Sequence, residues 1–160
     1  MRALLVTGSV GAGKTAVLLA LGELLAEREE PYALVDLDWL CWANAPEATP
    51  QELLVDNLQL VRETFARSGV TRLALCRYVR NEADVAAIRS AAGGELTVVA
   101  LDAPRAVLEA RLRSRDTGRE LAEHLAELER GATELDCPVV STGEGSPADA
   151  ARRVLAAAGW

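Results

Sequence analysis

The sequence lacks the features that would place the protein in a membrane, on nucleic acid or around a metal cluster. Its longest apolar run, residues 16–21, is far short of the roughly 18 residues needed to span a bilayer. Basic residues number 17 against 24 acidic ones, and this net charge of −7 argues against a surface that binds DNA or RNA. Cys41, Cys76 and Cys137 are odd in number and without metal-site spacing, which indicates buried or idle thiols. We therefore expect a cytoplasmic protein, monomeric or homodimeric, with small phosphorylated molecules still open as ligands.

Lysine and histidine each occur only once. Of the 17 basic residues 16 are arginine, and the single lysine, Lys14, lies in a glycine-rich segment. A lone lysine in an arginine-rich chain suggests that a compact ammonium on a flexible stem is needed at that position. His124 lies on the polar side of an expected helix, beside glutamates and without a nucleophile or ligand cluster in view, so we expect it to be solvated.

Short apolar segments alternate with helical patterns along the whole chain. The expected strands cover residues 2–7, 32–37, 72–78, 95–101 and 138–142. The expected helices cover residues 14–28, 50 to about 68, 82–92, 104–113, 119–130 and a last one from 147. Strands that alternate with helices imply right-handed crossovers and a parallel sheet covered on both faces. The pattern predicts one α/β domain over residues 1–160.

The glycine-rich segment matches the phosphate-binding pattern G-x-x-x-x-G-K-[ST] in full, and it follows an apolar strand and precedes a helix. Its residues are Gly8, Ser9, Val10, Gly11, Ala12, Gly13, Lys14 and Thr15. Glycines let successive backbone N–H groups face phosphate oxygens, and the start of the helix adds its positive dipole end. Lys14 is expected on the β- and γ-phosphates and Thr15 on Mg²⁺. This P-loop predicts binding of ATP or a close relative.

Charged residues follow the second and third strands, at the edge where ligands of parallel sheets lie. Asp36 and Asp38 end the second strand, and alternation would point both carboxylates the same way. Such a pair could take the proton of a substrate hydroxyl or hold Mg²⁺, unless it is a solvated, turn-forming strand end. Arg77 and Arg80 follow the third strand and suit an anionic ligand, or are ordinary surface arginines.

Four arginines lie close together after the fourth strand: Arg111, Arg113, Arg115 and Arg119. Arg111 and Arg115, spaced by four, share a helix face, and their mutual repulsion would favour an anion. Without a ligand, we expect this repulsion to leave the turn at residues 116–118 mobile. Solvated helix ends are the alternative.

These motifs resemble those of the small P-loop kinases related to nucleoside monophosphate kinases, particularly shikimate, gluconate and adenylylsulfate kinases. The resemblance rests on the P-loop, the Asp36-x-Asp38 pair, the segment from Leu101 to Arg115, and residues 141–147. It implies a three-layer fold with a five-stranded parallel sheet of order 2-3-1-4-5. It also implies a mobile lid after the fourth strand, here short and around residues 111–120.

The resemblance further implies a role for each matching residue, with ATP and Mg²⁺ as cofactors. Catalysis would fall to Lys14, Asp36, Asp38 and Arg115, with Thr15 and Asp36 on the metal. Beyond the P-loop, the nucleotide would contact Arg111, Arg119, Thr142, Gly143, Glu144 and Gly145. From the position of the strand ends, we also expect the acceptor to lie against Asp38, Trp39, Arg77 and Arg80. No diagnostic acceptor motif accompanies these residues, so the acceptor stays open between a hydroxyl metabolite and a nucleoside monophosphate.

Two functions are compatible with these residues. The first is an ATP-dependent small-molecule kinase. The second is a nucleotide-binding module or weak ATPase without transferase activity. The third strand ends in Cys76-Arg77 rather than in an acidic residue typical of ATPases, which favours the kinase.

Overall fold

A computed structural model describes residues 1–131 and 135–160 of the chain. Its centre is a five-stranded parallel sheet of order β2-β3-β1-β4-β5. The strands are β1 (Arg2–Gly8), β2 (Tyr32–Asp36), β3 (Arg72–Cys76), β4 (Leu96–Asp102) and β5 (Val139–Ser141). The fold class and strand order expected from the sequence are confirmed.

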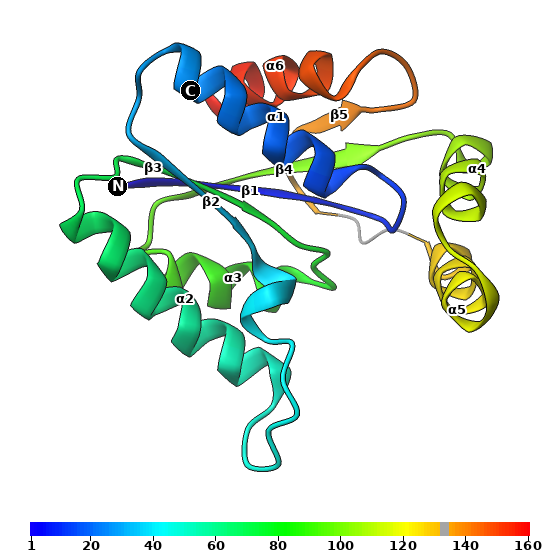
Figure 1. The fold of residues 1–160 in the computed structure, drawn as a ribbon, viewed down its shortest axis with the longest axis horizontal. Helices are drawn as coiled ribbons and strands as arrows, with labels where there is room; N and C mark the ends of the chain where they lie inside the picture. The colour runs from blue at the N-terminus through cyan, green and yellow to red at the C-terminus, as the bar shows by residue number, and fades with distance from the viewer. Residues whose placement is uncertain (132–134) are drawn as a thin grey trace.

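Helices cover both faces of the sheet (Figure 1). They are α1 (Lys14–Glu27), α2 (Pro50–Arg67), α3 (Glu82–Ala91), α4 (Arg105–Arg115), α5 (Gly118–Glu129) and α6 (Pro147–Ala158). One core joins the sheet to α1 and α6, with leucines of α4 and α5 at its margin; the other joins it to α2 and α3. Side chains alternate along β1, so Leu4 packs into the first core and Leu5 into the second. No helix among the described residues is both long and apolar enough to cross a membrane.

Two helix starts follow the expected local chemistry. Thr49 caps α2 and Ser146 caps α6, each in a reciprocal capping box and each followed by proline. In α2 the Thr49 N–H donates to the Glu52 carboxylate over 2.7 Å, while the Glu52 N–H donates to the Thr49 hydroxyl. These caps satisfy N–H groups that a helix start leaves unpaired.

Strand β2 is shorter than expected, and the difference affects the site. It ends at Asp36, and a 3₁₀ helix, η1 (Leu37–Leu40), follows directly. The Asp36 carboxylate accepts a hydrogen bond from the Asp38 N–H over 3.2 Å, because a short aspartate side chain competes for backbone donors. The prediction that strand alternation aligns Asp36 and Asp38 was therefore wrong, since Asp38 lies in a helical turn.

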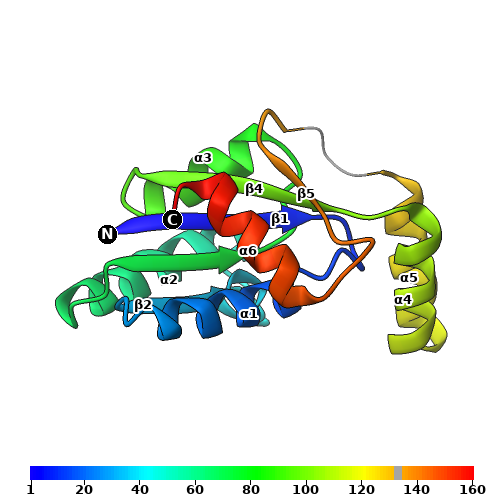
Figure 2. The same ribbon diagram turned by 90° about the horizontal axis from the view of Figure 1, so that it is seen from above.

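Helices α4 and α5 form a hairpin beyond the carboxyl end of β4, at one end of the molecule (Figure 2). Leu108 and Leu112 of α4 and Leu128 of α5 are buried against the core on the α1 side. The hairpin thus has an apolar seam to the rest of the domain, close to the loop that follows β1. This arrangement places the arginine-rich segment on the side of the sheet where its strands end.

Candidate active site

The loop between β1 and α1 has the geometry of a phosphate cradle. A side chain at Gly8 would collide with the carbonyl of Leu101 in the neighbouring strand, so the close approach of these strands requires glycine. Gly13 caps α1 with φ at 89°, a left-handed conformation that glycine adopts without strain. Helix α1 therefore begins at Lys14 with its N-terminus facing the loop, the arrangement that binds anions at helix starts.

Lys14 is folded back onto its own loop. Its ammonium Nζ donates to the carbonyl oxygens of Gly8 and Ser9 over 2.9 and 3.0 Å. Burial lowers the pKa of Lys14, while the carboxylates of Asp38, Glu127 and Asp36 act in the opposite direction. Lys14 is half-buried, and the loop carbonyls hold its ammonium where phosphate oxygens could replace them.

Thr15 and Asp36 connect the P-loop to the second strand. The Thr15 hydroxyl donates to the Asp36 carboxylate over 3.1 Å. A hydroxyl and a carboxylate oxygen are hard donors of the kind that Mg²⁺ prefers, so this pair fits the expected metal. The same carboxylate lies beside the buried Cys76, where burial first and the charge of Asp36 next raise the pKa of the thiol. Cys76 is therefore a protonated core residue and no nucleophile.

Asp38 lies next to this pair and forms an ion pair with Arg77. Its carboxylate is 3.4 Å from the Arg77 guanidinium, which is also 3.0 Å from the Cys41 sulfur. Desolvation raises the pKa of the Asp38 carboxyl, and Arg77 pulls it in the opposite direction. A carboxylate with a raised pKa is a better proton acceptor than an ordinary aspartate. The structure thus brings together four predicted residues, Thr15, Asp36, Asp38 and Arg77.

Arg111 and Thr142 close the opposite side of the P-loop. The Arg111 guanidinium donates to the Gly11 carbonyl over 3.3 Å, and to both the hydroxyl and the carbonyl of Thr142. The Thr142 hydroxyl in turn donates to the Ala12 carbonyl over 2.9 Å. Arg111 therefore joins α4, the P-loop and the end of β5.

A hollow of about 140 Å³ adjoins this junction. Its lining is Ala12, Gly13, Val17, Arg111, Thr142, Gly145, Ser146, Pro147 and Ala150. Small and apolar side chains beside a guanidinium suit a flat, uncharged ring such as a nucleobase. Three of the residues that we expected to contact the nucleotide, Arg111, Thr142 and Gly145, lie together in this lining. Gly143 and Glu144 instead line a separate hollow with Pro104 and Arg153. Their contact with the nucleotide stays a prediction.

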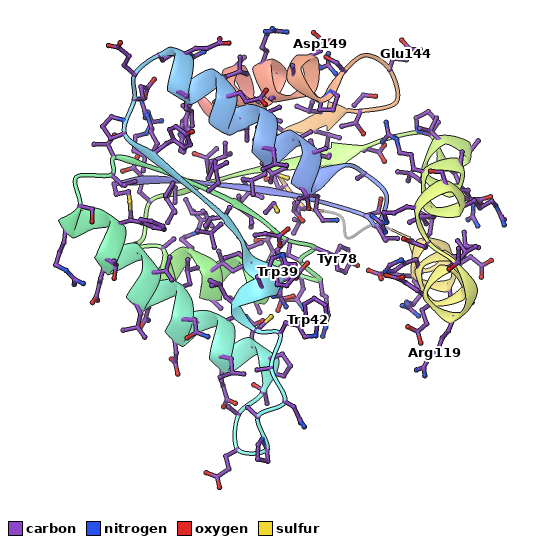
Figure 3. The ribbon with its side chains drawn as sticks, in the orientation of Figure 1. Trp39, Trp42, Tyr78, Arg119, Glu144 and Asp149 are labelled. Atoms are coloured by element: carbon purple, nitrogen blue, oxygen red, sulfur yellow. The ribbon has the colours of Figure 1, made fainter. Side chains whose placement is uncertain are left out.

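The remaining arginines of the cluster are already paired with acids. Arg113 lies 4.0 Å from Glu109, Arg115 contacts Asp116 through two nitrogens, and Arg119 contacts Glu123 over 2.6 Å. Three of the four arginines thus lie beside a carboxylate, which weakens the repulsion that we expected between them. Figure 3 shows Arg119 at the tip of the hairpin, where 91% of its side chain is exposed. The catalytic role of Arg115 and the phosphate contact of Arg119 stay predictions.

His124 is not the solvated residue that we expected. Its Nδ1 lies 2.7 Å from the buried Asp116 carboxylate, which also holds Arg115. The sequence spacing of Asp116 and His124, eight apart across a helix start, could have suggested this pair. Glu120 lies within 4.8 Å of both, but the bidentate Arg115 already neutralises Asp116. The group connects α4 to α5.

Sequence reasoning also missed Glu127. This α5 residue lies close enough to the site for its charge to act on two pKa values. It opposes the lowering of the Lys14 pKa by burial, and it adds to the raising of the Asp38 pKa. Its position three after His124 on one helix face was the signal that could have drawn attention to it.

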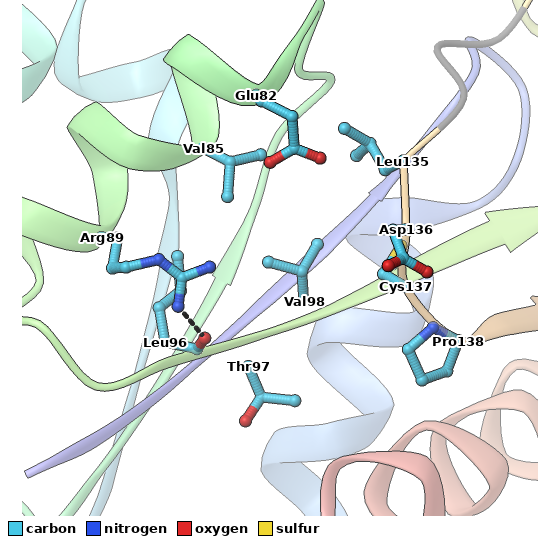
Figure 4. A pocket seen from close by; sticks show the side chains of 10 residues that line it. All are labelled: Glu82, Val85, Arg89, Leu96, Thr97, Val98, Leu135, Asp136, Cys137 and Pro138. Atoms are coloured by element: carbon cyan, nitrogen blue, oxygen red, sulfur yellow. Dashed lines mark hydrogen bonds between the residues drawn. The ribbon is translucent and has the colours of Figure 1, made fainter.

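A third hollow, of about 330 Å³, lies between α3, β4 and the segment before β5 (Figure 4). Glu82 and Asp136 border it, and Arg89 bonds to the Leu96 carbonyl at its edge. The residues of the P-loop and of the Asp36–Asp38 pair take no part in its lining. We do not assign it to the site.

Comparison with known proteins gives structural matches only. No model of a protein family matches the sequence. No curated protein is similar to it at a significant level. A sugar kinase from Janibacter sp. HTCC2649 shares 18% identity with a TM-score of 0.66, covering 98% of this chain and 94% of its own. A gluconokinase from Sinorhizobium meliloti 1021 shares 22% identity with a TM-score of 0.65, covering 99% and 91%.

An adenylylsulfate (APS) kinase from Mycobacterium tuberculosis, solved with AMPPNP and APS, shares 20% identity, with a TM-score of 0.64 and coverage of 97% and 95%. This chain shares the fold of these three kinases. The expected resemblance to gluconate and adenylylsulfate kinases is thereby confirmed at the level of the fold. These matches concern the fold, and the role of each site residue rests on the geometry described above.

Proposed function

We propose that the protein is an ATP-dependent kinase that transfers a phosphoryl group from Mg-ATP to a small acceptor. The observation that carries this proposal is the contact of Thr15 with Asp36, because it joins the P-loop directly to the acidic turn that holds Asp38. A P-loop alone binds nucleotide. The Asp38 carboxylate beside it could accept the proton of an acceptor hydroxyl, as transfer to a hydroxyl requires.

Each residue has a defined task in this reaction. Lys14 would exchange the loop carbonyls for the β- and γ-phosphates and spread the developing charge. Thr15 and Asp36 would hold Mg²⁺, which would offset the negative charge of the phosphates when bound. Asp38 would accept the proton of the acceptor hydroxyl as the new P–O bond forms and the bond to the ADP leaving group breaks. Arg111 and Thr142 would position the adenine ring of ATP.

The similarity to kinases of known structure supports this reading, because several of them share the whole fold and not the P-loop alone. One observation favours the alternative, a nucleotide-binding module or weak ATPase. Arg115 and Arg119 are both engaged by carboxylates, so the lid arginines that would complete a transfer site are not turned to the P-loop.

The experiment that separates the two supplies Mg-[γ-³²P]ATP and a panel of alcohols, sugars, sugar acids and nucleoside monophosphates. We expect a labelled organic product with the wild type and none with Lys14→Ala. Binding of Mg-ATP with release of inorganic phosphate alone would instead establish the module or ATPase.

A further inference from the structure

Two tryptophans are exposed beside the proposed acceptor carboxylate. Trp39 and Trp42 are 70% and 77% exposed, an unusual state for the largest apolar side chain. Their ring centroids are 5.0 Å apart, with 44° between the ring planes. Trp39 directly follows Asp38, and both rings are labelled in Figure 3. We call the two rings the tryptophan shelf.

The backbone under the shelf is held in place. Leu37 is fully buried in the core on the α2 side, and the Asn57 amide donates to the Leu40 carbonyl over 2.7 Å. The Cys41 N–H and sulfur both contact the Asp38 carbonyl. An ordered backbone reduces the entropy lost when a ligand settles on the rings.

The charges beside the shelf favour an uncharged ligand. Arg77, the cation next to Asp38, is already paired with that carboxylate and is only 16% exposed. Asp36, Asp38 and Glu127 add negative charge around the proposed phosphates. A carboxylate or phosphate on the acceptor would meet these groups at a cost, whereas a neutral ring would stack on the indoles.

We propose that the acceptor is an uncharged alcohol with a flat aromatic ring, which stacks on Trp39 and Trp42 with its hydroxyl at Asp38. This inference rests on the proposed kinase function and names its acceptor class. It excludes sugar acids and nucleoside monophosphates as the main acceptors.

Matched probes test this directly. D-glucose, D-gluconate and phenyl β-D-glucopyranoside share hydroxyls but differ in charge and in the aromatic ring. Trp160, the third tryptophan, packs over Arg72 at the other end of the chain, so a Trp160→Phe background leaves Trp39 and Trp42 as the only indoles. Fluorescence quenching in that background reports on the shelf alone.

We expect the phenyl glucoside to bind at least about tenfold more tightly than glucose or gluconate. Trp39→Ala and Trp42→Ala should each remove about tenfold of that affinity, and the phenylalanine variants should restore part of it. Leu60→Ala, which removes another exposed apolar side chain on α2, should change nothing. Equal binding of the three probes, tightest binding of gluconate, or a protein dimer that the alanine variants dissociate would overturn the proposal.

The kinase proposal is tested separately by Mg-ATP affinity and by labelled product. Ring-dependent binding without product would leave the shelf in place and remove the kinase. Labelled product from gluconate with unchanged kinetics in the tryptophan variants would keep the kinase and overturn the acceptor class.

Discussion

Arg111 holds Thr142 at two points, its hydroxyl and its carbonyl, and thereby fixes the end of β5 against the P-loop. The Thr142 hydroxyl is buried and donates onward to the Ala12 carbonyl. One hydroxyl therefore serves a guanidinium and a loop carbonyl that lie far apart in the sequence. This junction forms one wall of the hollow that we assign to the adenine ring of ATP.

Thr142→Val should lower both stability and ATP affinity. Valine keeps the shape but removes the hydroxyl that joins Arg111 to the Ala12 carbonyl, while Arg111 keeps the Gly11 and Thr142 carbonyls. The unpaired Ala12 carbonyl should cost about 1–3 kcal/mol in the free energy of unfolding. Urea unfolding and calorimetric titration with Mg-ATP measure the two effects. Thr142→Ser keeps the hydroxyl and is the matched control. Equal behaviour of the two variants would show that the hydroxyl has no role in the junction.

Lys14→Ala should abolish phosphoryl transfer, with a loss of about 3 kcal/mol or more in transition-state stabilisation. Because Lys14 Nζ also bonds to the Gly8 and Ser9 carbonyls, we expect a small loss of thermal stability as well. Single-turnover kinetics and thermal unfolding on the same samples test this. Wild-type turnover in the variant would mean that the loop is not the catalytic site.

Asp38→Asn and Asp36→Asn should fail in different steps. Asp38→Asn removes the proton acceptor, so we expect a fall in kcat of about a hundredfold or more with ATP affinity nearly intact. Asp36→Asn alters the group that Thr15 contacts, so it should weaken Mg²⁺-dependent ATP binding first. Calorimetry with and without Mg²⁺, beside turnover, separates them. Equal loss of both properties in Asp38→Asn would move Asp38 to the metal shell.

The sequence was sufficient to predict the fold, the P-loop and most helix boundaries. Those features depend on local rules: the G-x-x-x-x-G-K-T segment, the capping boxes at Thr49 and Ser146, and apolar strands between helices. The prediction failed where a short polar side chain competes for a backbone donor. The Asp36 carboxylate accepts a hydrogen bond from the Asp38 N–H at the end of the strand, and strand alternation alone does not predict this bond.

Side-chain pairing was the other limit. The resemblance implies a catalytic role for Arg115, which stays a prediction, whereas its ion pair with Asp116 and the contact of Asp116 with His124 were not expected. Likewise Glu127 approaches Lys14 only because the α4–α5 hairpin lies beside the P-loop. Such contacts depend on tertiary packing, which spacing along the chain can suggest but does not establish.

The Asp116 group predicts a pH dependence of stability. Arg115 first, and then His124, hold the pKa of the Asp116 carboxyl at about 2, below its ordinary value of 3.8. The ionised carboxylate therefore stabilises the fold above pH 3.8, and this contribution is lost as pH falls toward 2.

Asp116→Asn should thus be less stable than the wild type between about pH 5 and 8, with a difference that shrinks below pH 4. Melting temperatures across this range measure it. Arg115→Gln, which removes the main cause of the low pKa, is the matched variant and should show a smaller pH-dependent change. A difference that is constant down to the acid limit would assign the loss to packing.

The last prediction concerns residues 111–120, the segment expected to act as a lid. Arg111 already contacts the P-loop, so a nucleotide that fixes the loop should also fix the end of α4. For Arg115 to reach phosphate it must exchange the Asp116 carboxylate for the nucleotide, which would draw the turn toward the P-loop and exclude water. Amide hydrogen exchange through residues 111–120 should therefore slow when a non-hydrolysable ATP analogue and Mg²⁺ are added.

Two arginine variants show which charge is responsible. Arg115→Ala should reduce this added protection and lower kcat, whereas Arg113→Ala should leave both within about twofold, because an exposed ion pair such as Arg113–Glu109 contributes little. The same exchange experiment on all three proteins, with turnover beside it, is sufficient. Protection confined to residues 8–15 would show that the hairpin does not close, and without a closing lid the nucleotide-binding module becomes the better account of the protein.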